Sequence, residues 1–113
     1  MAIKISVSDI VGIKIEATIN DETGAAKPYE FGLTCTRYSS EEIDDKLAGD
    51  YSAPAVMAFM FEVIKGWSGV RSEDDKAAVP YSEDNFRALC KTAGVLFLAF
   101  KCYREQVGVK AKN

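Results

Sequence analysis

The sequence predicts an α+β fold: an N-terminal antiparallel β-sheet of about three strands, packed on a C-terminal bundle of about four helices. Apolar and polar residues alternate with a period of two in much of the first third of the chain, which is typical of half-buried strands. From Tyr38 onward the apolar residues recur at the three- and four-residue spacing of helices. Two Tyr-Ser pairs, each followed by acidic residues, mark helix starts.

One domain is expected, because 113 residues of which 48% are hydrophobic can bury a single core. We divide it into a β-rich part (1–38), a helical part (39–108) and a flexible basic tail (109–113). Three cysteines, no histidine and a net charge of −3 complete the composition. The basic residues are scattered, which argues against nucleic-acid binding.

Two strands are predicted to form a hairpin. The first alternates from Ile13 to Ile19, and the second alternates from Tyr29 to Cys35. Turn-forming residues around Gly24 separate them, which favours an antiparallel pair. Thr, Lys and Glu on the opposite positions predict a sheet that is covered on one face only. A third strand is expected at Ile3, Ile5 and Val7.

The first helix is predicted to begin with a capping box, in which Ser39 and Glu42 each accept from the other's backbone N–H. Tyr38 and Ile43 are placed to pack together as a hydrophobic staple. The helix is expected to end at Gly49.

A second helix is predicted from about Ser52 to Lys65, with Pro54 tolerated in its first turn. Its apolar residues surround the axis almost completely, so we expect burial on two sides, one of them against another subunit. Gly66 is expected to end the helix in a left-handed conformation. Trp67 would then be largely buried as the last residue of the apolar stripe. That stripe consists of Val56, Phe59, Met60, Val63, Ile64 and Trp67, and the opposite face of Ala55, Met57, Ala58 and Phe61.

The acidic run Glu73–Asp75 is interpreted as a solvated loop. A third, short helix is predicted to begin at the N-cap Ser82, with Tyr81 and Phe86 as its staple. The sequence KTAG interrupts the pattern, and a last helix is expected from about Val95 to Val107.

Catalytic motifs are incomplete. GWSGV resembles the G-x-S-x-G nucleophile elbow, but Val70 replaces the second glycine and no histidine is present to activate Ser68. The run SEDDK lacks the spacing of a calcium loop. Cys35, Cys90 and Cys102 lie in apolar surroundings, which is typical of buried, reduced thiols. We therefore predict no enzyme, with no catalytic residue, metal, cofactor or small-molecule substrate.

Neither a secretory signal peptide nor an apolar stretch long enough for a membrane span is recognised, so a soluble, cytoplasmic protein is expected. The remaining hypothesis is protein binding. Candidate residues for either the core or a partner surface are Phe59, Met60, Ile64, Trp67, Phe97 and Tyr103.

Residues 30–113 resemble the tail assembly chaperones of tailed phages and prophages. The resemblance is carried by FGLTCTRYSSEEID, by VIKGWSGV followed by an acidic stretch and VPYSEDNFRALC, and by GVLFLAFKCYREQVGVKAKN, in that order. The first 30 residues match less distinctly.

The resemblance implies a non-enzymatic protein in the cytoplasm of the bacterial host, which binds the long, helical tape measure protein and keeps it soluble during tail assembly. It also implies self-association, and a longer form made by ribosomal frameshifting near Lys112 and Asn113. The net negative charge favours basic client segments. The alternative is a structural tail or head–tail component that is retained in the virion.

Overall fold

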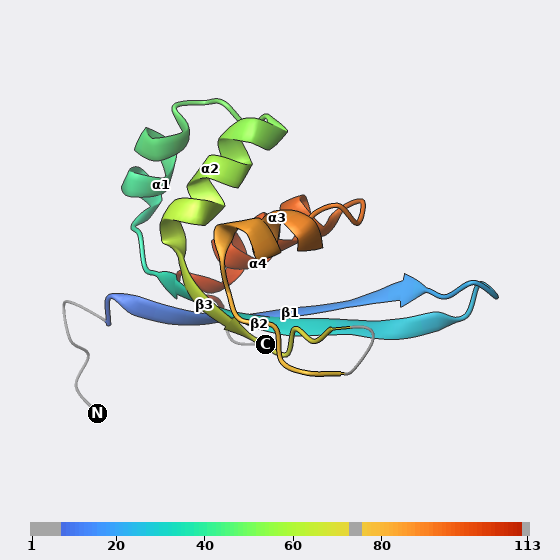
Figure 1. The fold of residues 1–113 in the computed structure, drawn as a ribbon. Helices are drawn as coiled ribbons and strands as arrows, with labels where there is room; N and C mark the ends of the chain where they lie inside the picture. The colour runs from blue at the N-terminus through green and yellow to red at the C-terminus, as the bar shows by residue number, and fades with distance from the viewer. Residues whose placement is uncertain (1–7, 73–75, 112–113) are drawn as a thin grey trace.

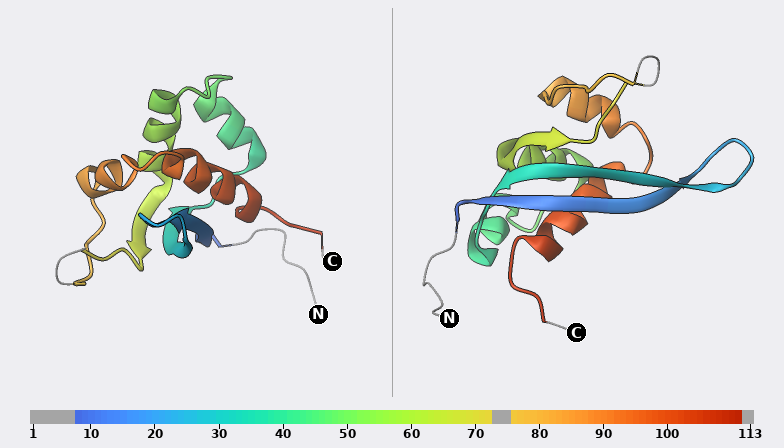
Figure 2. Two further views of the ribbon diagram at one scale, coloured as in Figure 1. Left: turned by 90° about the vertical axis from the view of Figure 1, so that its right-hand side faces the viewer. Right: turned by 90° about the horizontal axis from the view of Figure 1, so that it is seen from below.

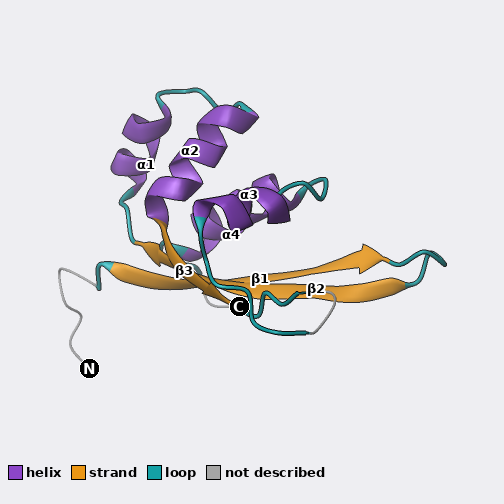
Figure 3. Cartoon of the chain, viewed as in Figure 1, coloured by secondary structure: helices purple, strands orange, loops and turns teal. Residues whose placement is uncertain are grey.

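The computed structural model describes residues 8–72 and 76–111 and confirms the α+β fold. A three-stranded antiparallel sheet, in the order β1-β2-β3, carries the helices on one of its faces (Figures 1 and 3). The strands are β1 (Ile10–Asn20), β2 (Ala26–Thr36) and β3 (Ile64–Ser68), and the helices are α1 (Ser40–Leu47), α2 (Ala53–Val63), α3 (Glu83–Leu89) and α4 (Val95–Gln106).

The predicted hairpin is confirmed. β1 and β2 pair along their whole length, with Ile13 opposite Leu33 and Ile15 opposite Phe31. These side chains are buried beneath the helices, whereas the intervening Lys14 and its even-numbered neighbours on β1 are exposed. The far end of the hairpin extends past the helical layer as a two-stranded arm (Figure 2).

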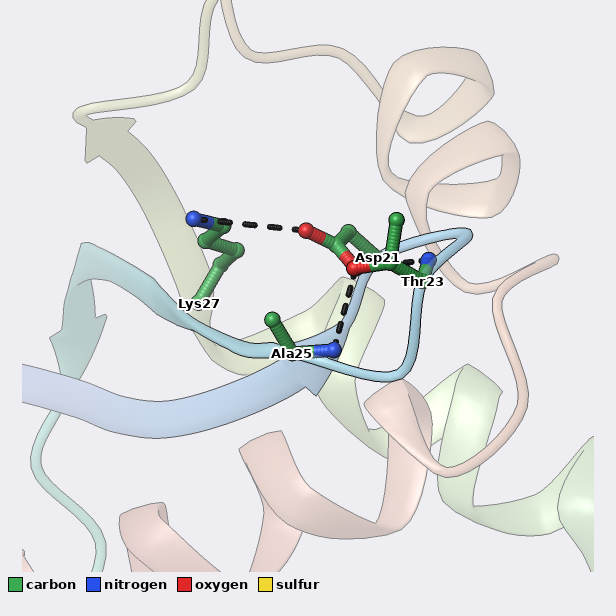
Figure 4. A network of polar contacts seen from close by, with 4 residues as sticks. All are labelled: Asp21, Thr23, Ala25 and Lys27. Atoms are coloured by element: carbon green, nitrogen blue, oxygen red, sulfur yellow. Dashed lines mark hydrogen bonds and ion pairs between the residues drawn. The ribbon is translucent and has the colours of Figure 1, made fainter.

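The turn at the tip of this arm is organised by Asp21 (Figure 4). Its Oδ1 atom accepts hydrogen bonds from the backbone N–H groups of Thr23 (2.8 Å) and Ala25 (3.0 Å) and from the Thr23 hydroxyl (2.6 Å). These bonds, led by the one from the hydroxyl, lower the pKa of Asp21. Gly24 adopts a positive φ of 87°, which glycine tolerates better than other residues. The turn thus sets which residues of β1 and β2 face each other, starting with Asn20 and Ala26 next to the turn.

The third strand of the described sheet comes from a segment that the sequence predicts as the end of a helix and the turn after it. β3 pairs with β2, placing Trp67 opposite Leu33 and Ile64 opposite Cys35 across a register shift. The proposed strand at Ile3, Ile5 and Val7 lies outside the described residues, as does the acidic run Glu73–Asp75.

The predicted extent of the second helix is therefore wrong. α2 ends at Val63, and Ile64 already has an extended backbone with φ −76° and ψ 126°. Gly66 lies within β3 and has no positive φ; Gly69 (φ 81°) redirects the chain after the strand. Pairing with β2 satisfies the backbone of this segment in an extended form, so tertiary structure overrides a pattern that could continue the helix. The helical part assigned to 39–108 accordingly contains a strand.

The predicted helix starts are confirmed. Ser39 and Glu42 form the capping box of α1, and Ile43 and Leu47 are buried. α1 ends two residues earlier than expected, because Ala48 takes a left-handed conformation before Gly49 does. The Ser52 and Ser82 hydroxyls accept from backbone N–H groups at the starts of α2 and α3. α4 begins at Val95 as predicted and ends at Gln106.

The core fills the space between the sheet and the helices. An aromatic cluster lies near its middle, where Phe59 contacts the rings of Phe100 and Tyr103 at centroid distances of 5.8 and 5.7 Å. The Tyr103 hydroxyl donates to the carbonyl of Thr36 (2.7 Å) and accepts from the N–H of Tyr38 (3.2 Å). These bonds join α4 to the end of β2. Core residues with side chains almost fully inaccessible to solvent are Ile13, Ile15, Cys35, Val56, Met60, Val63, Phe86 and Tyr103.

Candidate protein-binding groove

The structure separates the six candidate residues into core and surface. Four are buried and belong to the core: Phe59, Met60, Ile64 and Tyr103, with 0–4% of their surface exposed.

The remaining two candidates are accessible. Trp67 is half-buried on β3, so its predicted position at the end of a helix is wrong. Phe97 is on the surface of α4 and 47% exposed. The buried four cannot contact a partner without unfolding, which leaves Trp67 and Phe97 as accessible candidates.

A groove lies on the outer side of α2, away from the residues that α2 contributes to the core. Its volume is about 480 Å³. Its lining consists of Ala53, Pro54, Met57, Ala58, Phe61, Arg87 and Leu96.

Helical geometry explains why the groove follows α2. Met57 and Ala58 each lie three or four residues from both Pro54 and Phe61, so the four residues form one stripe along the helix. Over seven residues such a stripe extends about 10 Å. Buried Phe86 on α3 packs against Phe61 with ring centroids 6.0 Å apart, and this contact supports Phe61 from beneath the groove.

The sequence indicates this stripe but not that it forms a site. Met57, Ala58 and Phe61 belong to the second apolar face of a helix that the sequence predicts to be buried on two sides. In the structure Ala58 is exposed, and Met57 and Phe61 are half-buried. The apolar character of both faces was the available signal, but the contribution of Arg87 and Leu96 depends on how α3 and α4 pack against α2.

The thiols are held in their protonated form. Burial raises the pKa of Cys35 to about 12 and that of Cys90 to about 11, and it also raises the pKa of Cys102. A thiol must lose its proton to act as a nucleophile or metal ligand, so these environments suit a packing role. Within residues 8–72 and 76–111, no group of three or more Cys, Asp or Glu residues is arranged to hold a metal ion.

None of the helices in the described part of the chain is long and apolar enough to cross a membrane. Comparisons with protein-family models, with curated proteins and with solved structures found no match to this chain.

Proposed function

We propose that this chain is a non-enzymatic tail assembly chaperone that binds the helical tape measure protein of a phage or prophage in the cytoplasm of the bacterial host. The observation that carries the proposal is the groove along α2, whose α2 residues are all apolar. Its support from the sequence is the ordered set of motifs between residues 30 and 113.

The groove suits a helical client for a physical reason. A partner helix presents apolar side chains with the same three- and four-residue spacing as the α2 stripe, so the two stripes can pack along each other. Met57 supplies a flexible, polarizable side chain that adapts to different apolar partners. A client held in this way hides its apolar residues from other copies of itself, which keeps it soluble.

Self-association belongs to the same proposal, because an apolar groove on one copy can receive an apolar surface of another. Both forms of binding should depend on the exposed part of the α2 stripe. Ala58 is the residue of choice for testing this, because it lines the groove and yet is exposed, so a charge introduced there leaves the core intact.

The proposal is tested by co-expressing the chain with a phage tape measure protein. The wild-type chain should raise the soluble yield of the tape measure protein, and Ala58→Glu should abolish this effect by placing a charge in the groove. Ala88→Glu is the matched control, because Ala88 is an exposed alanine of α3 that does not line the groove. Light scattering on the same three proteins measures self-association.

Two results would contradict the proposal. One is a soluble yield that the wild-type chain does not change. The other is the presence of the chain in purified virions at structural stoichiometry by mass spectrometry, which is expected of a tail component and not of a chaperone.

A further inference from the structure

The outer edge of β1 is covered at one position and open beyond it. In an antiparallel pair, opposite residues exchange hydrogen bonds at every second position, so the alternate residues of an edge strand direct their N–H and C=O groups away from the partner strand. Lys14 is one of these outward residues, because both of its backbone groups bond to the Gln106 amide. Glu16, Thr18 and Asn20 continue the same row along β1.

A proline in β2 supports this assignment independently. Pro28 lies opposite Thr18, and a residue without an N–H fits a position that exchanges no hydrogen bond with β1. The nitrogen of Pro28 then faces the other edge of the arm, which β3 does not cover, since β3 pairs with β2 from Gly32 to Cys35 (Figure 2). A proline on an edge discourages strand addition. The arm therefore has one protected edge, on β2, and one edge on β1 without such protection.

The open part of the β1 edge comprises residues 16–20. Within residues 8–72 and 76–111, neither Glu16 nor Thr18 forms a backbone hydrogen bond outside the ladder between β1 and β2. The contact of Lys14 with Gln106 bounds the open edge on one side, and the turn organised by Asp21 bounds it on the other. An edge of this kind can pair with a strand from another chain.

The side chains that face the helices along this edge are apolar and accessible. Ala17 is half-buried, and Ile19 is 40% exposed. Both line a pocket of about 220 Å³, which Tyr29 on β2 and Leu98 on α4 also line. An added strand that places an apolar side chain beside Ala17 would bring that side chain to this pocket.

We propose that residues 16–20 of a second copy occupy this edge, paired antiparallel across a two-fold axis at Thr18. Thr18 is the middle residue of the open edge, so this register pairs the whole edge and stops short of the Gln106 contact and of the turn. Glu16 of each copy then lies opposite Asn20 of the other, and like charges do not meet. An axis at Glu16 would instead place two glutamates directly opposite each other.

The same register suits the helix-facing side of the sheet. Ile19 of each copy lies opposite Ala17 of the other, so it is covered at the pocket that Leu98 lines. The two sheets join into one continuous sheet, with the helices of both copies on the same face. Because each copy contributes the same segment, the contact closes after two copies and gives a dimer and not a fibre.

Disulfide cross-linking tests the position of the axis. In this dimer the two Thr18 residues form a hydrogen-bonded pair, whose Cα atoms are about 5.5 Å apart, a separation that a disulfide can span. Thr18→Cys should form a covalent dimer under mild oxidation about tenfold faster than Thr34→Cys, because pairing raises the local thiol concentration. Thr34→Cys is the matched control, since Thr34 is an exposed threonine of the central strand β2. The wild-type chain gives the background from the native cysteines.

Sedimentation equilibrium tests the backbone pairing. The wild-type chain should reach twice its mass of 12.4 kDa as its concentration rises. Thr18→Pro removes the central N–H of both copies and no bond of the ladder with β2, so it should raise the dissociation constant of the dimer at least about tenfold. Thr18→Val keeps the N–H and should leave that constant unchanged. Circular dichroism verifies folding, and the cross-linking test stands if Thr18→Pro does not fold.

A wild-type chain that stays monomeric at high concentration would overturn the proposed dimer, and so would equal cross-linking rates of Thr18→Cys and Thr34→Cys. Adding Ala58→Glu to Thr18→Cys should leave its cross-linking rate unchanged, whereas a loss of cross-linking would assign the contact to the groove along α2. The dimer does not rest on the proposed function. The soluble yield of the tape measure protein in co-expression is measured separately, so either can fail without the other.

Discussion

Trp67 attaches the segment between β3 and α3 to the sheet. Its indole Nε1 donates a hydrogen bond to the carbonyl of Val79 at 2.7 Å, and its ring packs edge-on against Tyr81 with centroids 5.3 Å apart. Val79 and Tyr81 directly precede the N-cap of α3, so the single tryptophan helps to set the position of that helix. Trp67 is half-buried because it lies at the border of the core, where it contacts this segment.

Two substitutions of Trp67 distinguish the stability contributed by its hydrogen bond from that contributed by the packing of its ring. Trp67→Phe keeps an aromatic ring and loses the bond to Val79, so the free energy of unfolding should fall by about 1 kcal/mol. Trp67→Ala also loses the contact with Tyr81 and should cost about 3 kcal/mol, the lower end of the range for a fully buried aromatic residue. Urea denaturation followed by circular dichroism measures both. Equal stability of wild type and Trp67→Ala would show that the ring does not help to hold the segment between β3 and α3 against the sheet.

Tyr103 makes the stability of the fold sensitive to alkaline pH. Burial raises the pKa of its hydroxyl to about 12, from an ordinary value of 10.0. Because the unfolded chain loses this proton first, the contribution is fully present below pH 10 and declines as the pH rises from about 10 to about 12. Buried Cys35, whose pKa is also raised to about 12, adds to the same decline.

The Tyr103→Phe variant measures how much Tyr103 contributes to this loss of stability at alkaline pH. It leaves the carbonyl of Thr36 and the N–H of Tyr38 without their partner, so it should be less stable by about 1–3 kcal/mol at neutral pH. Its unfolding free energy should also fall less steeply between about pH 10 and pH 12 than that of the wild type. Urea titrations at several pH values test both effects, and parallel pH profiles would contradict the assignment.

Among the elements, β1 is an edge strand, and α4 covers part of its edge through one side chain. The Gln106 amide accepts from the N–H of Lys14 at 2.8 Å and donates to the carbonyl of Lys14 at 2.7 Å. The amide thereby occupies a position that a neighbouring strand would otherwise take. Edge strands left open pair readily with other chains, so this contact limits unwanted strand addition to β1.

Gln106→Ala should therefore have two effects. Losing both hydrogen bonds should lower the unfolding free energy by about 1–2 kcal/mol, and the opened edge should increase aggregation. Glu105→Ala is the matched control, because Glu105 is an exposed neighbour on the same helix. Thermal denaturation and light scattering over time provide the readouts. Similar aggregation rates for the two variants would rule out a protective role for Gln106.

Elements defined by local signals were the predictable ones. The hairpin follows from its period-two alternation and from the turn residues around Gly24, and α1 follows from the capping box of Ser39 and Glu42. β3 was missed because Val63, Ile64 and Trp67 fit the spacing of a helix as well as that of a strand. The choice between the two depends on the pairing of this segment with β2, which is distant in the sequence.

At the scale of the molecule, the groove could be predicted only in part. The apolar stripe of α2 was visible in the sequence, whereas its position outside the core became clear only with the packing of α3 and α4. The same packing places Arg87 over the ring of Phe61.

The position of β3 in the chain determines the order in which the molecule can fold. β2 ends at Thr36 and β3 begins at Ile64, so the sheet cannot be completed until both α1 and α2 have been synthesised. The contact between Lys14 and Gln106 closes a separation of 92 residues. Contacts between distant residues slow folding. An isolated two-stranded hairpin is at best marginally stable in water. We therefore expect the hairpin to become stable only after the helices that cover its apolar face have been synthesised.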